Sequence, residues 1–106
     1  METKSAIIRG TTPTIQFNFA DIIVSNISDA VLVIKQNNLN VIEKQFSEAT
    51  VGNANISWLL TQKETLTLGA KRKAYIMCDW KLVDGTRGRS IIKEIDVEDS
   101  GVNGEI

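Results

Sequence analysis

The feature that most constrains the fold is an alternation of apolar and polar side chains near the start of the chain. Three large apolar residues are interleaved with three uncharged polar ones: Ile15, Phe17 and Phe19 with Thr14, Gln16 and Asn18. Successive side chains of a strand point to opposite faces of a sheet. The spacing therefore predicts a strand with one face in a core and the other in water.

Further segments carry strand signals, and 31 of the 106 residues are the β-branched Ile, Val or Thr, which pack well on sheets. We predict strands over residues 6–9, 14–19, 30–36, 41–46, 54–60, 74–82 and 89–98. The segment 30–36 is apolar on both faces, as expected of a central strand. Residues 21–29 fit either a short strand or a packed turn. In the last strand, one face is expected to carry Ile91, Ile95 and Val97, and the other face the carboxylates of Glu94, Asp96 and Glu98.

Turn signals separate these strands. Asn37-Asn38 and Asp84-Gly85-Thr86 are typical of hairpins, because their residues tolerate positive φ or favour tight turns. Thr61 followed by Glu64 is a capping-box pattern, which predicts a helix of one or two turns ending before Gly69. Together these signals predict a single all-β domain over residues 1–106. The expected fold is an antiparallel, immunoglobulin-like β-sandwich of about seven strands with one short helical turn.

The alternation also predicts the core. The residues expected to share it are Ile15, Phe17, Ile56, Trp58, Ile76, Cys78 and Trp80. Cys78 lies on the apolar face of its strand, so we interpret it as a buried structural thiol rather than a nucleophile. A single cysteine cannot form an internal disulfide, which suits synthesis in a reducing cytoplasm.

The chain contains no histidine, the usual general base near neutral pH and the commonest metal ligand. Histidine-based catalytic triads and zinc sites are therefore excluded. Glu94, Asp96 and Glu98, with Asp99 beside them, could contribute calcium ligands but lack the loop spacing that such sites use. A solvated strand face is the preferred interpretation. We expect no catalytic residue, no cofactor and no metal, and hence no enzyme.

Charge and hydropathy exclude further classes of function. The net charge of −1 disfavours nucleic-acid binding, which needs a basic surface. No apolar run approaches the roughly 20 residues that span a membrane. The polar residues 1–5 are not the pattern expected of a signal peptide. We found no phosphate-binding loop and expect no small-molecule substrate. The basic residues Lys71-Arg72-Lys73, Arg87 and Arg89 could meet an acidic protein partner, although solvated charges are the commoner case.

Four segments in the same order resemble short structural proteins of phages and prophages. They are residues 8–15 (IRGTTPTI), residues 60–66 (LTQKETL), the Asp84-Gly85 hairpin and residues 104–106 (GEI). Related sequences are similar to the N-terminal domain of phage upper baseplate proteins. The resemblance implies an immunoglobulin-like part of a virion, made in the host bacterial cytoplasm, that contacts other virion proteins in multiple copies. It leaves open the position in the particle, whether tail, baseplate, neck or capsid.

Such a module acts through its surfaces, so we expect contacts at the chain ends and hairpins. The predicted interface residues are Ile7, Ile8, Val102 and Ile106 in the tails, and Asn37, Asn38, Asp84, Gly85 and Arg87 in the hairpins. The tails could add a strand to a neighbour's sheet edge. The alternative function is a carbohydrate-binding or adhesion module, with Trp58, Trp80 and Tyr75 as a stacking platform. Exposed tryptophans would favour this alternative, and buried ones would disfavour it.

Overall fold

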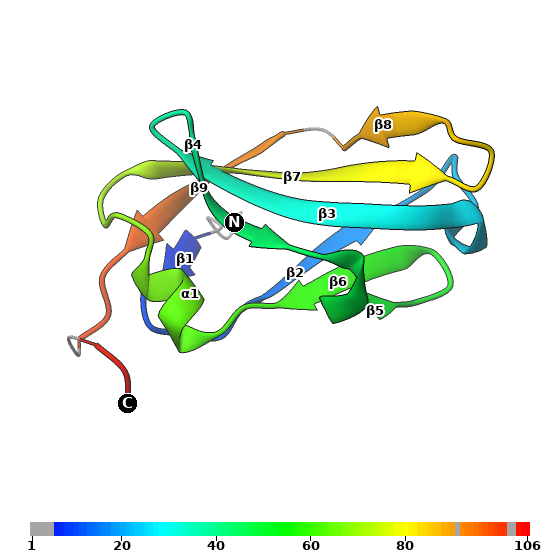
Figure 1. The fold of residues 1–106 in the computed structure, drawn as a ribbon. Coiled ribbons are helices and arrows are strands. Elements are labelled where there is room, and N and C mark those ends of the chain that lie inside the picture. The colour runs from blue at the N-terminus through cyan, green and yellow to red at the C-terminus, as the bar shows by residue number, and fades with distance from the viewer. Residues whose placement is uncertain (1–5, 91, 102–103) are drawn as a thin grey trace, which may run out of the picture.

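The computed structural model describes residues 6–90, 92–101 and 104–106, and these form an all-β sandwich of two sheets (Figure 1). The larger sheet contains β1 (Ala6–Ile8), β9 (Lys93–Glu98), β7 (Lys73–Leu82), β3 (Ile27–Gln36) and β4 (Leu39–Lys44) in that order, with β8 (Arg87–Arg89) paired to β7. The smaller sheet has the order β2 (Thr14–Asn18), β6 (Asn55–Leu59) and β5 (Thr50–Val51). The short helix α1 (Gln62–Leu66) connects β6 to β7.

The strand order is that of an immunoglobulin-type sandwich. β9, β7 and β3 stand in the order G-F-C of one sheet, and β2, β6 and β5 in the order B-E-D of the other. One expectation was wrong, because the sheets are not wholly antiparallel: β1 runs parallel to β9. These two strands come from opposite ends of the chain, so no hairpin forces them into opposite directions.

The prediction of one continuous strand over residues 89–98 was wrong, because the structure has two strands there, β8 and β9. β8 pairs with Asp79–Lys81, whereas β9 pairs with the beginning of β7. Between them, the Ser90 hydroxyl accepts the backbone N–H of Cys78 at 2.9 Å, and the Ser90 N–H donates to the Cys78 carbonyl at 2.9 Å. The hydrogen bond from the Cys78 N–H to the Ser90 hydroxyl thus takes the place of a backbone hydrogen bond between neighbouring strands. Ile91 lies outside the described residues.

Other boundaries differ more modestly. The ambiguous residues 21–29 form a packed 3₁₀ turn over Val24–Asn26, with Val24 buried, and then the start of β3. The hairpin at Asn37-Asn38 is confirmed, with φ of 53° and 62°. The capping box is also confirmed: the Glu64 N–H donates to the Thr61 hydroxyl at 3.1 Å, and Glu64 accepts the Thr61 N–H at 2.9 Å.

The predicted core is confirmed. Ile56, Trp58, Ile76 and Cys78 are fully buried in one cluster, while the other three residues are partly buried against it: Ile15, Phe17 and Trp80. Phe17 meets Trp58 edge-on, with ring centroids 6.0 Å apart and an interplanar angle of 79°. These side chains lie between the sheets, so the inner face of β2 belongs to the core.

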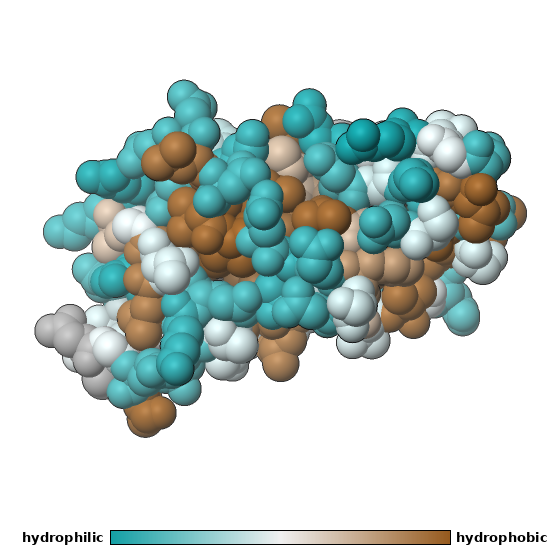
Figure 2. All heavy atoms as spheres, in the orientation of Figure 1, coloured by the Kyte–Doolittle hydropathy of each residue, from teal (hydrophilic) through white to brown (hydrophobic). Residues whose placement is uncertain are grey.

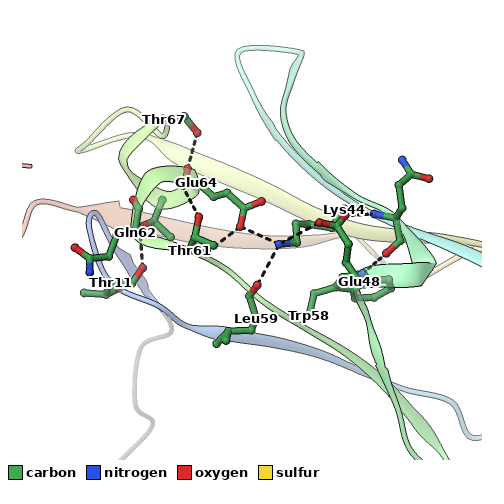
Figure 3. Close-up of polar contacts among 11 residues, drawn as sticks. Thr11, Lys44, Glu48, Trp58, Leu59, Thr61, Gln62, Glu64 and Thr67 are labelled. Atoms are coloured by element: carbon green, nitrogen blue, oxygen red, sulfur yellow. Dashed lines mark hydrogen bonds and ion pairs between the residues drawn. The ribbon is translucent and has the colours of Figure 1, made fainter. Parts of the chain in front are cut away.

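A buried lysine joins the two sheets along the β4 edge of the sandwich (Figure 3). Lys44, on the edge strand β4, donates to Glu64 at 2.9 Å and to the Leu59 carbonyl at 3.3 Å. Glu48 lies 3.7 Å from the same ammonium group. The buried charge is therefore paired and hydrogen-bonded, as a buried charge must be, and it fixes α1 against β4.

Candidate protein-interaction surface

An open groove lies between β2 and the part of the larger sheet formed by β1, β7, β8 and β9. It has a volume of about 1150 Å³. One wall is β2 with the residues that follow it, and the other comprises the start of β1 and the β8–β9 region. Phe17, Ile76, Trp80 and Ile95 give the groove an apolar lining. Phe17 and Trp80 are only partly buried, so part of their apolar surface is exposed in the groove.

The backbone of β2 is unpaired along this groove. Its only partner strand in the described part of the chain is β6. The Leu60 N–H donates to Pro13 and the Phe19 N–H to Ala54, so by alternation Ile15 and Phe17 also direct their peptide groups to β6. Thr14, Gln16 and Asn18 consequently direct their N–H and C=O groups outward. Three donors and three acceptors thus form a ready edge for another strand.

This edge lacks the features that usually block strand addition. The side chains at Thr14, Gln16 and Asn18 are exposed and uncharged, and β2 pairs with β6 in a continuous register from Thr14 to Asn18. Natural edges are commonly protected by charges, bulges or proline, but here Pro13 only precedes the strand. Across the groove, Lys93 shares the phase of the buried Ile95 and Val97 on β9 yet remains exposed.

Loops at one end of the sandwich form a second exposed apolar area. Ile23 is 68% exposed and Val83 is 70% exposed. The Val83 N–H donates to the Asn26 carbonyl at 2.8 Å, which holds the β7–β8 hairpin against the β2–β3 connection. Figure 2 shows apolar atoms at this end, on the right of the view. Two side chains make a small contact area, so the area is a weaker candidate than the groove.

The structure separates the predicted interface residues rather than uniting them. Asn37 and Asn38 lie next to the Lys35–Tyr75 pair of β3 and β7, whereas Asp84 and Gly85 follow the Ile27–Leu82 pair at the opposite end. Both hairpins are exposed, as is Arg87. The backbone N–H of Thr86 donates to the Asp84 carboxylate at 2.8 Å and lowers the pKa of that group.

The prediction for the N-terminal tail was wrong at Ile7, whose side chain is only 1% exposed and belongs to the core. The pairing of β1 with β9 places Ile7 on the inner face of the sheet. This pairing could not be predicted from the sequence of a short terminal segment. Ile8 points outward and is partly exposed. Ile106 is 95% exposed, and its N–H donates to the Gln62 side chain at 2.8 Å. Val102 lies outside the described residues.

The groups considered for chemistry have structural partners. Burial raises the pKa of the Cys78 thiol to about 12, with a smaller contribution from Asp79. Asp96 pairs with Lys73, and Asp99 with Arg9 at 2.7 Å. Within the described ranges, no three of the acidic and cysteine side chains are placed to hold a metal ion. The described helix is too short and too polar to cross a bilayer.

The aromatic residues do not make an exposed platform. Trp58 is buried, and its indole N–H donates to the Gln45 carbonyl at 3.0 Å. Trp80 is partly buried and packs against the core from β7, while Tyr75 is exposed on the opposite face of that strand. The arrangement disfavours a sugar-stacking surface, which needs aromatic rings that face solvent together.

A scan against protein-family models finds no match for the chain, and a search of the curated proteins finds no relative. The candidate site is therefore defined by geometry alone. Sequence reasoning missed the β2 edge, although the uncharged polar residues Thr14, Gln16 and Asn18 were visible. Alternation identifies the faces of a strand, but it does not reveal which strand lacks a neighbour.

Proposed function

We propose that this chain is a non-enzymatic structural protein of a phage virion, which acts by binding other virion proteins. The observation that carries the proposal is the edge of β2 that lies beside an apolar groove and pairs with no strand of the described residues. Strand addition to such an edge provides main-chain hydrogen bonds, and the groove accepts alternate side chains. A chain that presents this surface is suited to joining protein subunits.

The resemblance of four segments to phage and prophage structural proteins supplies the virion context. The buried, protonated Cys78 and the carboxylates of Asp96 and Asp99, which pair with Lys73 and Arg9, fit a structural role. The solvent-exposed hairpins and Ile106 offer additional contact points. The position in the particle stays open among tail, baseplate, neck and capsid.

The proposal is tested by the composition of particles purified from the phage or induced prophage that encodes the chain. Mass spectrometry of particles banded in a density gradient should detect the protein in a fixed ratio to a major structural protein. Particles washed in high salt provide the control for loosely adhering protein, because surface charge contacts weaken with ionic strength. Loss of the protein on washing, or its presence only in the lysate, would refute a role as a virion component.

A further inference from the structure

We infer that the groove binds a single extended segment of another virion protein, with apolar side chains at alternate positions and an acidic side chain in the same phase, opposite Lys93. The inference rests on the proposed function and specifies the kind of partner. Three observations support it: the outward peptide groups of β2, the two walls of the groove, and the charge of Lys93, which has no ion pair within the described residues.

The form of the occupant follows from the two walls. The groove is lined on one side by β2 and on the other by Ala6, Ile7 and Ile95 of β1 and β9. The larger sheet therefore extends past the edge of the smaller one. If a second sandwich approached β2 edge to edge, its own projecting sheet would collide with this one before the two edges could pair. One extended strand can enter between the walls and continue the smaller sheet.

The alternation of side chains along an extended strand indicates which residues of the bound segment should be apolar. Every second residue of a strand beside β2 points inward, toward Phe17, Ile76 and Ile95. These positions suit apolar side chains, because Phe17 and Trp80 are only partly buried in the groove and an apolar side chain would cover their exposed surface. The intervening residues lie beside Thr14, Gln16 and Asn18 on the outer face and need only be compatible with water.

The acidic residue follows from Lys93. Its side chain is on the inward face of β9 but makes no ion pair in the described part of the chain. The other charged residues around the groove are Asp21, Arg89 and Glu94. Glu94 interacts with Lys73, and Arg89 lies on the opposite phase of β8 from Gly88, which faces Trp80. Lys93 is therefore the cation best placed to meet an inward-pointing carboxylate.

The test uses two synthetic nine-residue peptides of identical composition. Both alternate valine with threonine and carry one central glutamate. In the first peptide the glutamate replaces a valine, and in the second it replaces a threonine. We expect the first to bind the full chain about tenfold more tightly by isothermal titration, because its charge reaches Lys93. NMR should show slowed exchange of the outward amides of Thr14, Gln16 and Asn18 in the complex.

Two variants make the assignment specific. Lys93→Glu should reverse the preference and bind a peptide with lysine at the same inward position. Gln16→Pro removes an outward N–H without touching the β6 pairing, and should abolish binding of both peptides. Equal affinity of the two peptides, or unchanged binding by Gln16→Pro, would overturn the inference. A groove filled by a second copy would appear as a dimer in sedimentation that Gln16→Pro dissociates, which would also overturn it.

The two proposals fail separately. Peptide binding to a protein that is absent from particles would refute the virion role and leave the groove specificity intact. A protein present in particles whose groove shows no peptide preference would refute the inference alone.

Discussion

Gly88 of β8 lies directly against the ring of Trp80, and a Cβ placed at position 88 would stand 2.2 Å from the ring atom Cζ2. The two residues are register partners in the β7–β8 pair. The absence of a side chain at 88 therefore allows Trp80 to lie flat over the hairpin and to form part of the groove lining.

Gly88→Ala should displace the Trp80 ring and destabilise the protein by about 1–3 kcal/mol, as overpacking usually does. Urea unfolding gives the free energy, and tryptophan fluorescence reports the displaced ring. Gly101→Ala is the matched control, because no atom of the described residues lies within 4 Å of its added Cβ. Equal stability of the two variants would contradict the close packing described.

Phe17→Ala should cost about 2 kcal/mol, less than a fully buried phenylalanine, since its ring is only partly covered and loses one edge-on contact with Trp58. Thr14→Ala on the outer face of the same strand should change stability by less than about 0.5 kcal/mol. Chemical denaturation measures both. Similar losses for the two variants would show that the inner and outer faces of β2 have been exchanged.

The stability of the protein should depend on Glu64 at acidic pH. Partial burial alone would raise the pKa of Glu64, but hydrogen bonds from Thr61 and the charge and hydrogen bond of Lys44 outweigh it and lower the pKa below 4.5. A carboxyl group with a lowered folded pKa contributes stability above its unfolded pKa, and this contribution is lost as the pH falls through the folded value.

Thermal melts of the wild type should therefore fall more steeply between pH 5 and pH 3 (roughly the carboxyl titration range) than those of Glu64→Gln. The variant should be less stable at neutral pH, because Lys44 loses its nearer charged partner while remaining buried and keeps only Glu48 at 3.7 Å. Glu43→Gln, on the exposed side of β4, is the control. Parallel pH curves for wild type and Glu64→Gln would contradict the assigned role.

Cys78 should be inert in the folded protein. Its pKa of about 12 keeps the thiol protonated at neutral pH, and the core covers the sulfur. Labelling with a thiol reagent should proceed at the rate of unfolding, and full labelling should require denaturant. Rapid, stoichiometric labelling of the native protein at pH 7 would show that the site is open.

The strands and the core were predictable because they depend on local alternation. Trp58 and Ile56 follow the period of two that buries them, and Thr61 and Glu64 form their capping box within four residues. The parallel pairing of β1 with β9, the burial of Ile7 and the free edge of β2 depend on contacts between distant segments. A single sequence contains no periodic signal for such neighbours, which is why the groove could not be predicted.

The most direct test of the central claim compares the incorporation of Gln16→Pro and Gln16→Thr into particles. Both variants should fold, since the Gln16 N–H faces away from β6. The phage gene is replaced by each variant, and the copies per purified particle are counted by quantitative mass spectrometry. The account predicts that Gln16→Thr is incorporated normally and that Gln16→Pro falls at least about tenfold, because its edge no longer accepts a strand. Equal incorporation of the two variants, with matching melting temperatures, would contradict it.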